Sequence, residues 1–146
     1  MKMRLLLTIV GLTIGLAVPA LAQENNTVDP EVRQQIEASI VKFDEAYNKN
    51  DPAAVAALYT QDAVEAWGWE KSLNTVSGRK AIERRYALHL PIPGKFSSNL
   101  VQVYAIGDDI CAISEFYRVY LKRKGYAVKI YARESDTWKI RMEYAN

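Results

Sequence analysis

The chain has 146 residues, of which 49% are hydrophobic and 25% are charged, and its formal net charge is +2. This length suits one domain with a core of its own, and the near balance of acidic and basic residues gives no indication of nucleic-acid binding. A single cysteine, Cys111, excludes an internal disulfide, and a single histidine, His89, leaves little material for a metal site or a Ser-His-Asp triad, so we expect no metal and no cofactor.

Residues 1–22 are predicted to be a secretory signal peptide. A basic start with Lys2 and Arg4 precedes an apolar run at 5–18, and Ala20-Leu21-Ala22 is a typical cleavage site. The apolar run has 14 residues, whereas a membrane-spanning helix needs about 20. We therefore expect an exported protein, periplasmic or secreted, with no membrane contact after cleavage. A flexible leader at 23–28 and one folded domain at 29–146 complete the chain.

Two helices are predicted at the start of the domain. Asp29 can cap the first helix, and an apolar face with a spacing of three or four residues continues for several turns. Asp51 can cap a second, short helix, because Pro52 fits its first turn and helix-forming alanines follow. Tyr59 is predicted to end this helix, and a strand is expected at about 63–67.

The rest of the domain is predicted to be mainly antiparallel sheet. A loop is expected at 68–76, followed by a third helix from about 77 to 89. Strand-like runs then occupy 96–106, 110–121, 126–133 and 137–144. The tight turn at Ser135-Asp136 pairs Tyr131 with Ile140. This order predicts an α+β fold, with three helices packed on one face of a curved antiparallel sheet.

The order and spacing of these segments resemble the ketosteroid-isomerase-like superfamily, which is also called nuclear-transport-factor-2-like. The matching segments are NDPAAVAALYTQDAV at 50–64, SGRKAIERRY at 77–86, the GDD turn at 107–109 and ESDTWKIRMEY at 134–144. The resemblance covers about residues 29–144 and is to the SnoaL-like group. It implies a cone-shaped domain, a pocket between helices and sheet, and a homodimer formed through the sheet.

Two departures from the resemblance concern the catalytic positions. Ketosteroid isomerases carry an Asp general base after the DA pair and a Tyr on the first helix that donates to the oxyanion. The matching positions here hold Trp67 and Phe43, which can neither abstract a proton nor donate such a hydrogen bond. In many SnoaL-like relatives, His residues occupy the positions of Met142 and Tyr144. The resemblance therefore implies the pocket and argues against that isomerase mechanism.

Glu115 and Glu65 are the candidate acid–base residues. Glu115 lies on the more apolar face of the strand at 110–121, where partial desolvation would raise its pKa. It could instead pair with an arginine, or face solvent if the other strand face is the core. Glu65 shares a strand face with Trp67, so both would face the pocket together.

Aromatic side chains with a polar tip are abundant, and such side chains suit the wall of a pocket. For most of them, a place in the core or a dimer interface is the alternative, and for His89 it is a contact with the dipole of the third helix. The residues expected to bind a ligand are Trp67, Tyr86, His89, Tyr117, Tyr131 and Tyr144.

The function expected from these observations is binding of a small apolar organic molecule in an aromatic-lined pocket, without ketosteroid-isomerase chemistry. One alternative is an enzyme, an isomerase, dehydratase or hydrolase, that uses Glu115 or Glu65 as acid or base. The other is a dimeric interaction module whose pocket is filled by side chains.

Overall fold

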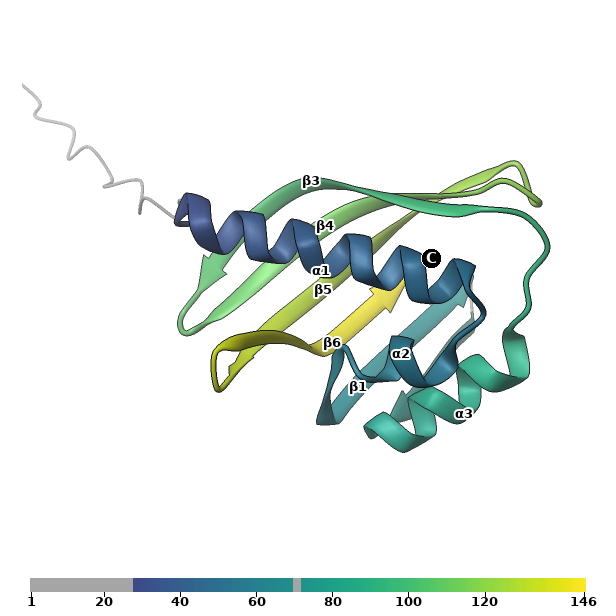
Figure 1. Cartoon of the computed structure of the whole chain (residues 1–146), viewed down its shortest axis with the longest axis horizontal. Helices are drawn as coiled ribbons and strands as arrows, with labels where there is room; N and C mark the ends of the chain where they lie inside the picture. Colours follow the sequence, from purple (N-terminus) through teal and green to yellow (C-terminus); the bar gives the residue numbers. More distant parts are fainter. Residues whose placement is uncertain (1–27, 70–71) are drawn as a thin grey trace, which may run out of the picture.

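The computed structural model describes residues 28–69 and 72–146. The predicted signal peptide, and the leader up to residue 27, lie outside the described residues. Within the described ranges the chain forms three helices and one six-stranded sheet (Figure 1). None of the helices in this part of the chain is long and apolar enough to cross a membrane.

The elements follow one another in the order α-α-β-β-α-β-β-β-β. The helices are α1 (Pro30–Asn48), α2 (Pro52–Ala56) and α3 (Arg79–His89). The strands are β1 (Tyr59–Trp69), β2 (Ser72–Ser77), β3 (Phe96–Ile106), β4 (Asp109–Arg118), β5 (Arg123–Glu134) and β6 (Thr137–Ala145). The sheet order is β2-β1-β6-β5-β4-β3, and every pair is antiparallel except β1 with β6. The predicted α+β class is therefore confirmed.

The predicted caps of α1 and α2 are confirmed. The Asp29 side chain accepts a hydrogen bond from the backbone N–H of Glu31 at 2.8 Å, and Asp51 accepts one from Ala54 at 2.9 Å. The predicted end of the second helix is wrong, because α2 stops at Ala56 and Tyr59 already opens β1.

The loop predicted at 68–76 is also wrong, because β1 continues to Trp69 and β2 pairs with it as an edge strand. The residues of β2 are polar for the most part and almost all exposed. An edge strand of this composition lacks the alternation of apolar and polar residues that identifies a half-buried strand.

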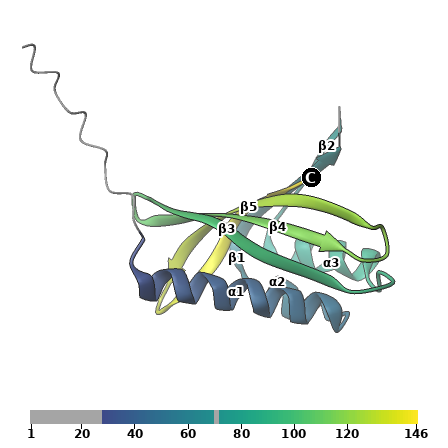
Figure 2. The same ribbon diagram turned by 90° about the horizontal axis from the view of Figure 1, so that it is seen from above.

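All three helices lie on the same side of the sheet (Figure 2). The core between these layers contains Ile36 and Ile40 of α1, Ile82 of α3 and Ile140 of β6, each at most 3% exposed. Full burial of a side chain of this size stabilises a fold by roughly 1.5–3 kcal/mol. The opposite side of the sheet is not covered by any helix of the described residues.

The face of β4 that points toward the helices is the reverse of the predicted one. Ile110, Ala112 and Phe116 are buried under the helices, whereas Glu115 and its neighbours on the other strand face point outward. The prediction was wrong because it took the more apolar face as the covered one. The helix-facing side of β4 instead combines apolar residues with small and polar ones, because a cavity lies against it.

A bulge within β6 determines which of its residues face the helices. The predicted pairing of Tyr131 with Ile140 is confirmed, but the next pair is Ile130 with Met142, so one residue of β6 is extra. Beyond this bulge the alternation of β6 is inverted. Glu143 consequently faces the helices with only 4% of its surface exposed, and Tyr144 faces outward.

Candidate functional site

A cavity of about 380 Å³ lies between α1, α3 and the helix-facing side of the sheet. This volume is within the range of small-molecule sites in proteins. The rings on its wall belong to Phe43, Tyr47, Trp67, Tyr86, Phe96 and Phe116. The charged residues on its wall are Glu65, Arg85, Arg118, Arg123, Lys129 and Glu143. The cavity is thus in the predicted place, but its wall is more charged than that of the predicted hydrophobic pocket.

Two acidic residues and a lysine form a row across the sheet. The parallel pairing of β1 with β6 places Glu65 directly beside Glu143, and the antiparallel pairing of β6 with β5 places Lys129 on the far side of Glu143. All three residues are almost completely buried, with 3–4% of their surface exposed. Buried charges at this density are rare in a fold unless they have partners.

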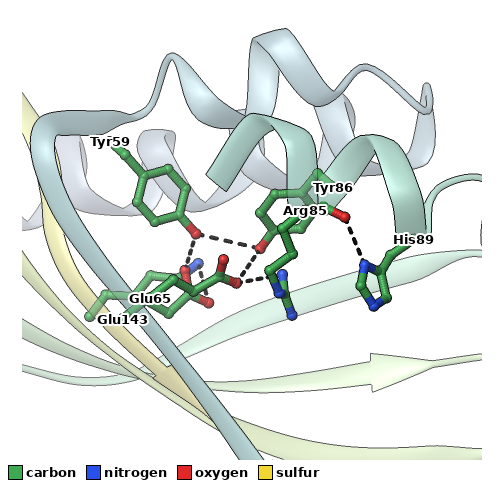
Figure 3. A network of polar contacts seen from close by, with 7 residues as sticks. Tyr59, Glu65, Arg85, Tyr86, His89 and Glu143 are labelled. Carbon is green, nitrogen blue, oxygen red and sulfur yellow. Dashed lines mark hydrogen bonds and ion pairs between the residues drawn. The ribbon is translucent and has the colours of Figure 1, made fainter. Parts of the chain in front are cut away.

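Glu65 is held from α3 by two residues that follow one another (Figure 3). Arg85 Nη1 donates to Glu65 Oε1 at 2.7 Å, and the Tyr86 hydroxyl donates to the same oxygen at 2.9 Å. The other oxygen, Oε2, has no hydrogen-bond partner in the described part of the chain. Because a buried acceptor without a partner is costly, this oxygen is the one that remains on Glu65 to take up a proton.

Glu143 is held by the partners on its other side. The Tyr59 hydroxyl donates to Glu143 Oε2, and Lys129 Nζ lies 3.8 Å from Glu143 Oε1. The hydroxyl oxygens of Tyr59 and Tyr86 are 3.5 Å apart, so the two carboxylates are linked through two phenols (Figure 3). Each phenol has one proton and donates it to a carboxylate.

Burial and the neighbouring charge of Glu143 raise the pKa of Glu65 from its ordinary value of 4.5 to about 7. Arg85, the hydrogen bond from Tyr86 and Lys129 act in the opposite direction but do not outweigh desolvation. Burial also raises the pKa of both Tyr59 and Tyr86 well above 10, with further contributions from the two glutamates. The tyrosines therefore stay neutral donors, while Glu65 exchanges its proton near neutral pH.

Trp67 and Phe43, which occupy the positions of the two isomerase groups, each make a cation–π contact. The guanidinium of Arg85 lies 3.9 Å from the centre of the Trp67 ring, and Lys129 Nζ lies 3.8 Å from the centre of the Phe43 ring. Such contacts stabilise a cation that has been removed from water. The rings thus hold in place the cations that face the two glutamates.

Four of the predicted site residues come together at the cavity: Glu65, Trp67, Tyr86 and His89. His89 is exposed, and its Nδ1 contacts the backbone oxygen of Arg85 at 2.7 Å.

The other four predicted residues lie elsewhere. Tyr131 is fully buried in the core but does not line the cavity, and Tyr117 and Tyr144 are exposed on the outer face of the sheet. Glu115 is on that outer face too, where Lys124 Nζ donates to its Oε1 at 2.9 Å. The expectation of a desolvated Glu115 inside the pocket is therefore wrong, and the alternative of a paired residue outside the core describes its position.

Three of the charged residues around Glu65, namely Arg85, Lys129 and Glu143, were not predicted from the sequence. Arg85 directly precedes the predicted site residue Tyr86, and this was a usable signal. Lys129 interrupts an apolar strand, AVKIY, and a lone charge in such a run indicates a functional or paired group. Glu143 had no signal, because only the bulge in β6 turns it inward. Within the described ranges, no three or more His, Cys, Asp or Glu residues gather in a way that could hold a metal ion.

Comparison with known proteins gives one family and many similar folds. The family model described as SnoaL-like domain matches residues 40–142. No curated protein is a significant match to the sequence.

Among solved structures, an NTF-2 like protein of unknown function from Silicibacter pomeroyi is 14% identical, with a TM-score of 0.67 over 82% of this chain and 98% of that one. A Streptomyces avermitilis protein of the NTF2-like family, provisionally named a dehydratase, is 22% identical, with a TM-score of 0.63 over 80% of this chain and 96% of that one. A Novosphingobium aromaticivorans protein with the provisional name aromatic ring hydroxylase is 17% identical, with a TM-score of 0.67 over 82% of this chain and 91% of that one. At these identities the likeness concerns the fold alone.

Proposed function

This chain belongs to the SnoaL-like domain family, and we propose that its cavity binds a small organic molecule with which Glu65 exchanges a proton. The observation that carries the proposal is the state of Glu65. It is a buried carboxyl group on the cavity wall, with one oxygen held by Arg85 and Tyr86 and the other without a partner in the described residues.

A carboxyl group in this environment suits general acid–base catalysis. Its pKa of about 7 means that the protonated and the ionised form are both populated near neutral pH. Arg85 and Tyr86 fix Oε1, so the orientation of the whole carboxyl group on the cavity wall is fixed as well. The reaction class that this supports is proton abstraction from carbon, as in an isomerisation or a dehydration. The dehydratase name of the Streptomyces avermitilis neighbour belongs to this class.

The test uses 5-nitrobenzisoxazole, a flat aromatic probe of carboxylate bases. A base removes its ring C–H proton next to nitrogen, the N–O bond breaks, and a coloured cyanonitrophenolate forms. We expect the purified domain to accelerate this reaction, with a rate that rises with pH around a midpoint of about 7. Glu65→Gln should reduce the rate by about 100-fold or more, since it removes the base.

Glu115→Gln is the matched control for this test. It makes the same chemical change on the outer face of the sheet and should leave the rate within about twofold of the wild type, because a surface change away from the site has little effect. A rate equal to that of free acetate, or an unchanged rate in Glu65→Gln, would overturn the catalytic proposal.

Binding without turnover is the second candidate function. It is favoured by Trp67 and Phe43, which occupy the positions where the resemblance placed a base and a hydrogen-bond donor. Native mass spectrometry of protein purified from its own host would show a bound small molecule. Recovery of that molecule unchanged after prolonged incubation with the domain would favour binding over catalysis.

We also propose that the protein is exported. The signal peptide predicted at 1–22 supports this, and N-terminal sequencing of the protein from its host should begin at Gln23. A mature protein that still starts at Met1 in the cytoplasm would contradict export.

A further inference from the structure

Two arginines lie opposite each other at one end of the cavity. Arg118 ends β4, Arg123 begins β5, and the two are directly paired across the strands. Both line the cavity. The pairing therefore places two cationic side chains at the same end of the cavity.

Arg118 has few partners of its own among the described residues. It takes part in none of the ion pairs found there, and its Nε is buried without a hydrogen-bond partner. Its guanidinium lies 5.0 Å from the centre of the Phe116 ring, which is also part of the cavity wall. A guanidinium group normally uses its donors in a planar fork toward a carboxylate or a phosphate.

The side chains of the cavity wall have a surplus of positive charge. Among the residues that the structure describes, the arginine and lysine side chains of the wall are those of arginines 85, 118 and 123 and Lys129, and its carboxylate side chains are those of Glu65 and Glu143. Protonation of Glu65 increases the surplus further. A cavity with this balance raises the local concentration of small anions.

An apolar surface connects the arginine end to Glu65. The Phe96 ring centre lies 5.6 Å from that of Phe116 and 4.5 Å from that of Tyr47, and all three line the cavity. Burial raises the pKa of Tyr47, and the charges of Arg118, Arg85 and Glu65 also act on its hydroxyl. Tyr47 therefore lies within electrostatic reach of both the arginine end and the proposed base.

We propose that Arg118, with Arg123 across the strand, binds the carboxylate of the ligand, and that the ligand is a small organic acid with an aromatic or other flat apolar body. The carboxylate would lie at the arginine end, and the body would lie along Phe116, Phe96 and Tyr47. The far end of the molecule would then be near Glu65. This inference rests on the proposed small-molecule function of the cavity and adds the class of molecule.

The test compares 3-phenylpropanoate with 3-phenylpropanamide, which have the same size and shape but differ in charge. Dissociation constants and contacted residues would be measured by NMR titration of the ¹⁵N-labelled domain at pH 7.5. We expect the acid to bind at least about tenfold more tightly than the amide, since a charge-assisted bidentate contact is stronger than a neutral one. The shifts should centre on Ser98, Phe116 and Ala127 of the cavity wall.

Arg118→Gln should weaken binding of the acid by about tenfold and leave that of the amide within about twofold, because only the acid uses the charge. Arg118→Lys should retain part of the preference for the acid. Arg84→Gln is the matched control, because Arg84 is exposed on α3 and does not line the cavity. It should change neither constant.

Equal binding of the acid and the amide in the wild type would overturn the carboxylate site and leave the cavity as a small-molecule site. An unchanged preference for the acid in Arg118→Gln, in a variant whose spectrum shows the native fold, would overturn the role of Arg118. If neither probe binds, the carboxylate site is overturned as well. The acid–base role of Glu65 is then still decided separately by the benzisoxazole reaction, whose uncharged substrate does not depend on Arg118.

Discussion

The raised pKa of Glu65 makes the folded protein less stable as the pH rises. Its pKa is about 7 in the folded protein, against 4.5 for an ordinary glutamate. Between these two pH values the unfolded chain has lost the proton and the folded chain still binds it. The folded state binds more protons there, so the free energy of unfolding falls as pH rises from 4.5 to 7.

We expect this residue to account for a loss of about 3 kcal/mol of stability over that range, since each unit of pKa corresponds to about 1.4 kcal/mol. Urea unfolding of the wild type and of Glu65→Gln at several pH values measures it, because the contributions of groups that do not interact with Glu65 cancel in the difference between the two curves. The free energy of unfolding of the wild type minus that of the variant should fall as pH rises. A difference independent of pH would show that Glu65 is not desolvated in solution.

Tyr86 tunes Glu65 through the hydrogen bond that its hydroxyl donates to Oε1 at 2.9 Å. This bond lowers the pKa of Glu65, although less than burial raises it. Tyr86→Phe should therefore move the midpoint of the pH–rate profile with the benzisoxazole probe above 7, because the ionised form loses a donor.

Tyr117→Phe, on the outer face of the sheet, is the control for this change and should leave the midpoint where it is. A midpoint in Tyr86→Phe that is unchanged or lower would mean that the hydroxyl does not serve the ionised carboxylate.

At the scale of elements, α1 is fixed to β3 by side chains that imitate a strand partner. Asn48 Nδ2 donates to the backbone oxygen of Phe96 at 2.8 Å, and the backbone N–H of Phe96 donates back to Asn48 Oδ1 at 2.8 Å. One turn earlier, Asp44 accepts hydrogen bonds from the backbone and the hydroxyl of Ser98. These contacts hold the cavity-lining rings of α1 over the sheet.

Asn48→Ala should destabilise the domain by about 1–3 kcal/mol, because two backbone groups of Phe96 lose their partners at a partly buried position. Urea unfolding measures the loss. Asn99→Ala, at an exposed position of the same strand, should change stability by less than about 0.5 kcal/mol. Equal effects of the two substitutions would argue that the hydrogen bonds between Asn48 and Phe96 contribute no more to stability than an exposed side chain does.

Elements with a clear local signal could be predicted, and those shaped by their neighbours could not. Asp29 and Asp51 followed by proline identify helix starts in any context, and the turn at Ser135-Asp136 fixes the register of Tyr131 with Ile140. The bulge in β6 depends on how β6 meets both β1 and β5, and no residue type marks it. Because Glu143 faces the cavity only through this bulge, half of the glutamate pair could not be predicted from the pattern.

The two predicted acidic residues, Glu65 and Glu115, also differ in whether a local relation or the assembled fold decides their position. Glu65 shares its strand face with Trp67, and this local relation holds in the structure, where both line the cavity. The position of Glu115 depended on which face of β4 the helices cover, which is a property of the assembled layers. Apolar residues occur on both faces of β4, because one lies against the core and the other belongs to an exposed apolar surface.

At the scale of the whole molecule, that surface remains exposed in the part of the chain that the structure describes. The outer face of the sheet carries large apolar side chains that are 36–54% exposed, namely Tyr104, Ile106, Tyr117, Tyr126, Met142 and Tyr144. A contiguous surface of this kind on a protein in solution is typical of an interface. It supports the prediction, made from the family resemblance, of a homodimer formed through the sheet.

Met142 is the residue with which to test the dimer, because it lies between Val64 of β1 and Ile130 of β5 and is 46% exposed. We expect the wild type to sediment as a dimer and Met142→Lys to sediment as a monomer, since a buried charge at the centre of an interface has no partner there.

Leu88→Lys is the control, because Leu88 is 84% exposed on α3, on the other side of the sheet, and its replacement should leave the dimer intact. A wild type that sediments as a monomer at high micromolar concentration, or a Met142→Lys variant that remains dimeric, would show that this face is not the interface. Because the cavity lies on the helix-facing side of the sheet and Met142 on the other, Met142→Lys should retain the benzisoxazole activity, and this separates the effects of assembly from those of the site.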